Sequence, residues 1–351
     1  MNRGDQPTLH DGDLLLRPWE TSDVEQSLQL HDAEIARWFN VLSAPPSRVE
    51  HAAWVADTHD EWDSRSRATF LVEWQGMVAG SVDVRRVAEG VGSLSWVVYA
   101  PFRGRGLAGR AVRLLVDFAF AELGLSRVEA HVDPLNRPSL RIALRAGLRR
   151  EGLLRANARL GGELHDTVVF GRLEDDPPPG TREGFTAMLD SALPVKRAIA
   201  QGVLRNERGE VLLCELAYKR EWDLPGGVVD PNESPADCVA REVQEELGIT
   251  VRPRGLLAVD WMPPWLGWRD AVLLVFDLGT SPSHLVEGAV LEHREIRALH
   301  WADESVWAQQ VAPYNDRLLR SIGSIALDDP RAPGALYLED GDPTLVWEPR
   351  A

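Results

Sequence analysis

The segment from residue 174 to residue 184, EDDPPPGTREG, constrains most strongly how this chain of 351 residues can fold. Consecutive prolines and glycines cannot continue a helix or a central strand, and proline-rich runs act as semi-rigid spacers. The segment lies near the middle of a chain whose length fits two domains of about 150 residues each. We therefore predict a first domain at 1–173, a proline-rich linker at 174–193 and a second domain at 194–351. Residues 185–193 of the linker are expected to form a short helix.

The charge differs between the two parts of the chain. Residues 1–173 hold 21 Lys and Arg against 23 Asp and Glu, whereas residues 174–351 hold 17 against 31. The net charge of −16 is opposite to what binding of a nucleic-acid polymer requires. The apolar runs are too short to span a membrane, the N-terminus does not look like a signal peptide, and two cysteines fit a reducing compartment. We therefore expect a cytoplasmic protein with neither a nucleic-acid polymer nor a membrane as partner.

Hydrophobic patterning predicts an α+β or α/β class for both domains, with mostly antiparallel strands. In the first domain we predict helices over 23–31 and 107–123 and strands over 14–19, 69–74, 78–87, 93–100, 127–132 and 168–173. In the second domain we predict helices over 234–247 and near 303–321, and strands over 198–205, 211–216, 255–262, 271–278 and 298–303.

A glycine-rich turn, RGRGLAG at 103–109, joins the strand predicted at 93–100 to the helix predicted at 107–123. Glycines allow sharp turns that expose consecutive backbone N–H groups, and the positive end of a helix dipole follows directly behind them. Such a turn can hold a pyrophosphate. It can equally be a plain connection in which the glycines serve only the geometry of the turn.

The first domain resembles the GNAT acetyltransferases. The family's acetyl-CoA signature corresponds to Arg103, Gly106 and Ala108, and its second signature to Asn136, Ser139 and Gly147. The opening strand and helix resemble the RimJ/RimL-like branch, and the resemblance covers about 14–173. It implies a GNAT fold with a mixed, mostly antiparallel sheet, and transfer of an acetyl group from acetyl-CoA to an amine on a small molecule or a protein N-terminus.

The same resemblance implies the residues of the acetyl-CoA site. The residues expected to bind the co-substrate are Val97, Val98, Arg103, Gly104, Arg105, Gly106, Ala108, Gly109 and Asn136. Ser139 is the candidate acid for the leaving thiolate, because Ala143 stands where many members carry a tyrosine. Helix capping is an alternative role for Asn136 and Ser139. Asp83 and Glu129 are candidate bases only because they lie on strands near the expected site.

In the second domain, the helix predicted at 234–247 carries three carboxylates on one face. Ser234 and Pro235 mark its start and Gly248 its end. Glu242, Glu245 and Glu246 stand at i, i+3 and i+4, so they repel one another unless a cation is bound. Oxygen ligands of this kind suit Mg²⁺ or Mn²⁺, although a solvated acidic face is the alternative.

Residues 227–249 resemble the Nudix box at every defining position, and the resemblance covers about 195–350. The matching residues are Gly227, Glu233, Arg241, Glu242, Val243, Glu245, Glu246, Gly248 and Ile249. The resemblance implies an α/β/α sandwich and a Mg²⁺-dependent hydrolysis of a nucleoside diphosphate linked to another group. It assigns the metal to the three glutamates together with the backbone carbonyl of Gly227 or of Gly226, and it pairs Arg241 with Glu233.

Tryptophans near this box are either core residues or a platform for a nucleobase. The candidates are Trp222, Trp261 and Trp265. Taken together, the two resemblances predict a bifunctional enzyme that transfers acetyl groups and hydrolyses a small nucleotide substrate. The alternative is a Nudix hydrolase whose first domain binds acetyl-CoA without catalysis and regulates the second.

Overall fold

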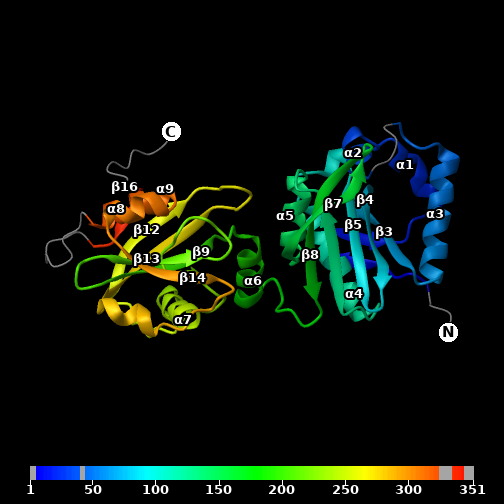
Figure 1. The fold of residues 1–351 in the computed structure, drawn as a ribbon. Coiled ribbons are helices and arrows are strands. Elements are labelled where there is room, and N and C mark those ends of the chain that lie inside the picture. The colour runs from blue at the N-terminus through cyan, green and yellow to red at the C-terminus, as the bar shows by residue number, and fades with distance from the viewer. Residues whose placement is uncertain (1–4, 40–43, 324–333, 344–351) are drawn as a thin grey trace. The chain divides into compact units, whose positions relative to one another are not determined.

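The computed structural model describes residues 5–39, 44–323 and 334–343, which divide into two compact units between Leu193 and Pro194 (Figure 1). The segment predicted as a linker is not wholly extended. It contains helix α6 (Arg182–Ala192), which is capped by Thr181 and packs against strand β7 (Arg149–Leu160) of the first unit. None of the described helices is both long enough and apolar enough to cross a membrane.

The first unit is built on one mixed sheet with the strand order β1-β2-β3-β4-β5-β6-β8-β7. Besides β7, its strands are β1 (Leu9–Asp11), β2 (Leu14–Arg17), β3 (Arg67–Trp74), β4 (Met77–Ala88), β5 (Val91–Val98), β6 (Arg127–Val132) and β8 (Glu163–Leu173). All neighbouring pairs are antiparallel except β5 and β6.

The parallel strands β5 and β6 pair over only three residues each, from Val91 to Ser93 and from Arg127 to Glu129. Beyond Ser93, strand β5 continues to pair with β4 on its other side, where Val97 lies opposite Ser81. The sheet therefore splits between β5 and β6, and the β5 edge that faces the split has no ladder partner there in the described part of the chain.

Helix α4 (Leu107–Ala121) supplies much of the core of this unit. Its buried residues include Val112, Leu115, Val116 and Ala119, which recur at helical spacing and pack into one hydrophobic cluster with the sheet. The remaining helices are α1 (Val24–Leu28), α2 (Ala33–Phe39), α3 (Arg48–Asp63) and α5 (Arg137–Arg145), with 3₁₀ turns at Thr21–Asp23 and Ala100–Phe102.

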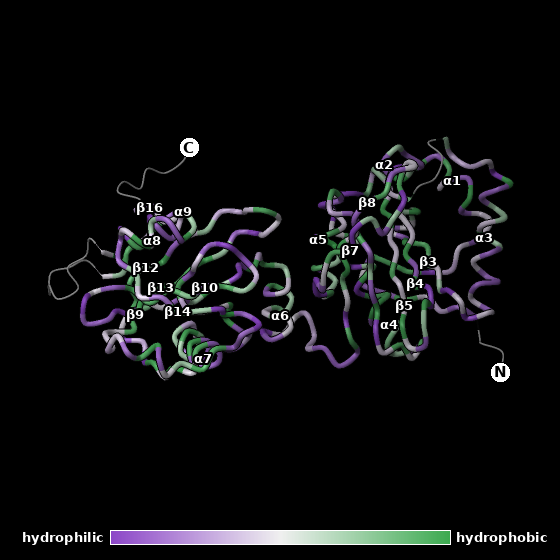
Figure 2. The backbone as a smooth tube through the Cα atoms, viewed as in Figure 1, coloured by the Kyte–Doolittle hydropathy of each residue, from purple (hydrophilic) through white to green (hydrophobic). Residues whose placement is uncertain are grey.

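Sequence patterning did not predict α2, α3 or β7. Helix α3 has no continuous apolar stripe, and hydrophilic residues dominate it in Figure 2. A capping box begins it, in which Ser47 accepts from the Glu50 N–H and the Glu50 carboxylate accepts from the Ser47 N–H. Three separate side chains, Val55, Thr58 and Trp62, are buried on it.

The second unit contains a sheet with the strand order β14-β10-β9-β13-β12-β15-β16, and β11 pairs with β9. The strands are β9 (Arg197–Arg205), β10 (Val211–Leu216), β11 (Gly226–Val228), β12 (Gly255–Met262), β13 (Ala271–Thr280), β14 (Ile296–Ala302), β15 (Leu336–Glu339) and β16 (Asp342–Pro343).

Helices cover both faces of this sheet, as the predicted α/β/α sandwich requires. Val203, Val211 and Leu213 share a core with Leu318 of helix α9 (Pro313–Gly323). The alternate residues Leu204, Leu212 and Cys214 share a second core with Val243 of helix α7 (Pro235–Leu247). The helix predicted near 303–321 is divided into α8 (Glu304–Gln310) and α9, and Pro313 begins the second helix. A further 3₁₀ segment spans Ser283–Gly288.

Candidate active sites

The glycine turn of the first unit depends on two left-handed residues. Gly104 and Gly106 both have φ of 78°, and a Cβ atom built on either would meet no atom within 4 Å. The glycines are therefore required by backbone conformation, whereas the space beside them is open. Gly106 caps α4 without a side chain, so backbone N–H groups at the start of this helix remain available to an anion.

A cavity of about 540 Å³ opens against this turn. Of the residues predicted to bind acetyl-CoA or to act on it, the following line the cavity: Val97, Val98, Arg103, Gly104, Gly106, Ala108, Gly109, Asn136 and Ser139. Arg105 does not line it, because its guanidinium lies over the ring of Trp74, 5.1 Å from the centroid. The split in the sheet and the glycine turn thus belong to one concave site.

Three arginines that the sequence analysis did not select also line this cavity: Arg113 on α4, and Arg141 and Arg145 on α5. They offer positive charge for a phosphate, whereas Arg103 is already bound to the carboxylates of Asp32 and Glu34, each at 2.8 Å. The spacing of Arg141 and Arg145 at i and i+4 was a signal that could have identified two of them.

Asn136 and Ser139 combine both roles that the sequence left open. The Asn136 side chain caps α5 by accepting from the Ser139 backbone N–H at 3.2 Å, and both residues line the cavity. Ala143 is fully buried in the core and does not line the cavity. The Ser139 hydroxyl is therefore placed on the ligand side of α5.

A second cavity, of about 840 Å³, is lined by Ser81, Ser95 and Val97 and by aromatic residues that include Trp19 and Trp54. Val97 lines both cavities. Trp96 and Val98 line only the first, so the two cavities lie at opposite faces of β5.

The two candidate bases of the first unit differ in position. Asp83 lines the second cavity, where burial raises the pKa of its carboxyl although Arg67 binds it at 2.7 Å. Glu129 lines neither cavity and pairs with Arg127 at 3.3 Å and His131 at 3.2 Å.

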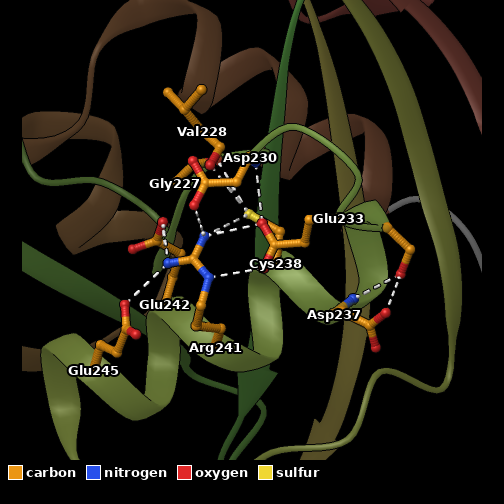
Figure 3. A network of polar contacts seen from close by, with 10 residues as sticks. Gly227, Val228, Asp230, Glu233, Asp237, Cys238, Arg241, Glu242 and Glu245 are labelled. Carbon is orange, nitrogen blue, oxygen red and sulfur yellow. Dashed lines mark hydrogen bonds and ion pairs between the residues drawn. The ribbon is translucent and has the colours of Figure 1, made fainter.

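In the second unit, α7 begins and ends where the sequence predicted. The Ser234 hydroxyl accepts from the Asp237 N–H, and Gly248 ends the helix with φ of 67°. Figure 3 shows Arg241 at the centre of a polar network on this helix. Arg241 donates two hydrogen bonds to Glu233, at 2.7 and 3.0 Å, which tie the preceding loop to the helix and lower the pKa of Glu233 to about 2.

Glu242 and Gly227 lie so close that any side chain at position 227 would displace the Glu242 carboxylate. A Cβ atom there would stand 2.4 Å from the Glu242 carboxylate. Glu246 is half-buried, and burial, Glu242 and a hydrogen bond with Glu295 raise its pKa to about 8. Glu295, which follows the helix by almost fifty residues, carried no sequence signal for a place in this cluster.

The donor set at α7 fits a divalent cation by its chemistry. Glu242, Glu245 and Glu246 provide carboxylate oxygens. Burial first, and then the nearby charge of Glu242, raise the pKa of Glu246, and a bound cation would favour its ionised form. In the arrangement described, Arg241 binds Glu242 at 3.0 Å and Glu245 at 2.9 Å. Among the described residues, no three His, Cys, Asp or Glu side chains converge as they would around a bound ion.

The three candidate tryptophans occupy different surroundings. Trp222 stacks on His300 with ring centroids 3.9 Å apart and lines a cavity of about 620 Å³ together with Tyr218, Lys219, Arg220 and Arg297. Trp261 is half-buried on β12, and Trp265 is exposed in the turn between β12 and β13. Neither Trp261 nor Trp265 lines a cavity described here.

Comparisons with known proteins agree with this division into two sites. The acetyltransferase (GNAT) domain family matches residues 13–149, and the NUDIX domain family matches residues 195–321. A probable N-acetyltransferase, YjcK of Bacillus subtilis, is 28% identical over 172 residues, which are 46% of this chain and 95% of that protein. Spermidine N(1)-acetyltransferase of Escherichia coli is 28% identical over 171 residues, which are 46% of this chain and 86% of that protein.

For the second unit, 8-oxo-dGTP diphosphatase of Escherichia coli is 39% identical over 59 residues, which are 16% of this chain and 46% of that protein. The fold, the two sites and these matches define an enzyme with one acyl-transfer unit and one hydrolase unit. The chain thus contains a GNAT acetyltransferase domain followed by a NUDIX domain.

Proposed function

We propose that the first domain transfers the acetyl group of acetyl-CoA to an amine. The observation that carries this proposal is the meeting of two cavities at Val97, on opposite faces of β5 beside the split in the sheet. One cavity holds the glycine turn and the arginines that suit a phosphorylated co-substrate. The other is lined largely by apolar and aromatic side chains and suits the acceptor.

In this arrangement, the backbone N–H groups at 104–109 bind the pyrophosphate of acetyl-CoA, and Arg113, Arg141 and Arg145 add positive charge. The Tyr99 N–H donates to Ala79 on the β4 side, so by alternation the Val98 N–H, next to Val97, faces the split. This N–H stabilises the charge that develops on the thioester carbonyl oxygen. Asn136 contacts the pantetheine arm, and the Ser139 hydroxyl donates a proton to the departing thiolate.

We propose that the second domain hydrolyses a small nucleoside diphosphate-linked substrate. Glu242, Glu245, Glu246 and a backbone carbonyl at Gly227 would hold Mg²⁺ or Mn²⁺, while Arg241 remains bound to Glu233. When bound, the ion neutralises the phosphates and lowers the pKa of a water molecule. Trp222, Lys219, Arg220 and Arg297 offer a stacking surface and positive charge for the nucleotide.

The full-length chain tests both proposals. Acetyl transfer is measured with acetyl-CoA and a panel of amines containing spermidine and a peptide with N-terminal serine. Hydrolysis is screened with sugar nucleotides, ADP-ribose, dinucleoside polyphosphates, CoA and nucleoside triphosphates, with Mg²⁺ and after its removal by EDTA. We expect turnover in both assays and loss of hydrolysis in EDTA. Tight binding of acetyl-CoA without transfer to any amine would instead favour a regulatory first domain.

A further inference from the structure

We propose that His165, oriented by the buried carboxylate of Asp133, is the general base that takes the proton from the acceptor amine. This inference rests on the proposed acetyl transfer by the first domain. Neither residue belongs to the motifs that identify the domain, and they lie 32 positions apart in the sequence.

A hydrogen bond joins the side chains of His165 and Asp133. The His165 Nδ1–H donates a hydrogen bond of 2.6 Å to Asp133 Oδ2. The Asp133 side chain is only 5% exposed, and its other oxygen accepts from the Leu135 N–H at 2.7 Å. An ionised carboxylate can only accept, so this bond fixes the proton on Nδ1 and leaves a lone pair on Nε2 when the imidazole is neutral.

The imidazole is accessible and its second nitrogen is available. The His165 side chain is 25% exposed, and Nε2 has no hydrogen-bond partner among the residues that the structure describes. A buried carboxylate that orients a histidine while the far nitrogen handles a proton is the arrangement by which catalytic triads position their base.

The register of the sheet places the pair on the face that carries the acceptor cavity, beside the residues that line it and not among them. Asp83 of β4 and Ser95 of β5 are paired, and both line the second cavity. Ser93, two residues before Ser95, lies on the same face of β5 and pairs with Glu129 of β6. On the other arm of the split, His131 pairs with Val169 of β8, so alternation puts His165 on this same face.

Asp133 and His165 also lie as far along the split as Val97, where the thioester is proposed to react. Glu129 and Ser93 are the last paired residues of β6 and β5. Asp133 and Val97 each follow four residues later, so both lie about 13 Å beyond the end of the ladder, on opposite arms of the split. Val97 lines both cavities, as Ile35 and Phe39 do, and the main chain beside it provides the proposed oxyanion donor.

Several other titratable groups lie on this side of the sheet or line the second cavity. His51 contacts the Ser27 hydroxyl through Nε2 at 2.7 Å, Glu50 accepts from the Ser47 N–H at 2.7 Å, and His31 and Tyr99 line the same cavity. His131 contacts Glu129 through Nε2 at 3.2 Å and Asn157 through Nδ1 at 3.3 Å, so neither ring nitrogen is available. Asp83 is bound by Arg67. On β7, Ala158 pairs with His165. The neighbouring Arg159 donates a hydrogen bond to the Gly162 carbonyl.

The proposed step is a balanced proton transfer. The amine nitrogen forms a bond to the thioester carbonyl carbon, and its extra proton passes to His165 Nε2. The carbon–sulfur bond breaks, its electron pair stays on sulfur, and the thiolate takes up one proton. The products are the amide and CoA, and His165 returns its proton to solvent.

The substitution His165→Asn in the full-length chain tests this role, because the Asn amide can keep the donor to Asp133 while removing the base. With spermidine and the N-terminal serine peptide, we expect kcat to fall at least 10²-fold and the acetyl-CoA dissociation constant to stay within twofold. The acidic limb of the wild-type kcat–pH profile should disappear. Asp133→Asn should lower kcat at least tenfold, because it no longer fixes the tautomer.

His131→Gln is the matched control, since it removes a histidine from the same face and should leave kcat within threefold. Circular dichroism and thermal unfolding establish that each variant is folded. A folded His165→Asn variant with wild-type kcat and pH profile overturns the proposal, as does loss of the acidic limb in His131→Gln instead. A wild-type chain that acetylates no amine overturns the proposed function itself, and this inference with it.

Discussion

The glycine turn at 103–109 and the helix α7 both offer a site for a phosphorylated ligand, but they are built from different parts of the chain. The turn uses main-chain N–H groups, exposed by two glycines with φ of 78°. Helix α7 uses side-chain carboxylates, which repel one another and are held by Arg241. The first site is therefore sensitive to backbone conformation, and the second to the charge of single side chains.

We expect the largest effect from Ser139, whose hydroxyl is proposed to act in the acetyl-CoA site beside the glycine turn. We expect Ser139→Ala to lower acetyl transfer by 10²–10⁴-fold, the range of a general acid, with little change in the acetyl-CoA dissociation constant. The substitution leaves the backbone N–H that Asn136 caps. Ser139→Cys, which keeps a proton donor, is the control, and wild-type kcat in the alanine variant would assign Ser139 to capping alone.

The second largest effect concerns the carboxylates of helix α7. We expect Glu246→Gln to lower hydrolysis at least 10²-fold, equivalent to about 3 kcal/mol of transition-state stabilisation, because a metal ligand and its charge are lost. Steady-state release of phosphate-containing product with Mg²⁺ measures it. Glu174→Gln changes the same charge on an exposed residue of the first unit and should have no effect on hydrolysis.

A smaller effect is expected when the backbone of the glycine turn is changed. Gly106→Val places a branched residue at φ of 78° and should weaken acetyl-CoA binding at least tenfold, about 1.4 kcal/mol. Gly124→Val is the matched control, because Gly124 also has positive φ and open surroundings but does not line the cavity. Calorimetry should show weaker binding only in the Gly106 variant, and equal losses in both would point to general destabilisation.

The smallest effect concerns stability alone, at a buried carboxyl outside both sites. Asp260 accepts from the Gly341 N–H at 2.9 Å, and burial raises its pKa from 3.8 to about 6. The folded state therefore favours the protonated form, so the stabilising contribution is complete below pH 3.8 and is lost as the pH rises to about 6. Asp260→Asn should remove this dependence and stabilise the second unit above pH 6, on the order of 1 kcal/mol. Urea unfolding at pH 4 and pH 7 measures it, and an unchanged slope with pH would contradict it.

The sequence was sufficient for features that depend on nearby residues. Helix α7 was predicted with both ends because Ser234 and Gly248 are local signals, and Glu242, Glu245 and Glu246 share a face by helical spacing alone. The strand β12 was predicted with the bounds that the structure shows, because only Asp260 interrupts the apolar run from Leu256 to Met262.

Features that depend on sheet order could not be predicted in the same way. The contact of Asp133 with His165 exists because β8 returns beside β6, and nothing near either residue indicates that pairing. Glu295 joins Glu246 for a similar reason, through the loop that precedes β14. Helix α3 was missed because only three of its 16 residues are buried. Val55, Thr58 and Trp62 share one face, but one of them is a threonine, so the apolar signal is weak.

The central claim is that the two sites act independently, one through its main chain and the other through its carboxylates. The most direct test measures both acetyl-CoA binding and Mg²⁺-dependent hydrolysis on the same purified full-length variants, Gly106→Val and Glu246→Gln. We predict that the first loses only acetyl-CoA affinity and that the second loses only hydrolysis. Collapse of acetyl-CoA binding in a folded Glu246→Gln variant, or hydrolysis at the wild-type rate in that variant, would contradict the account.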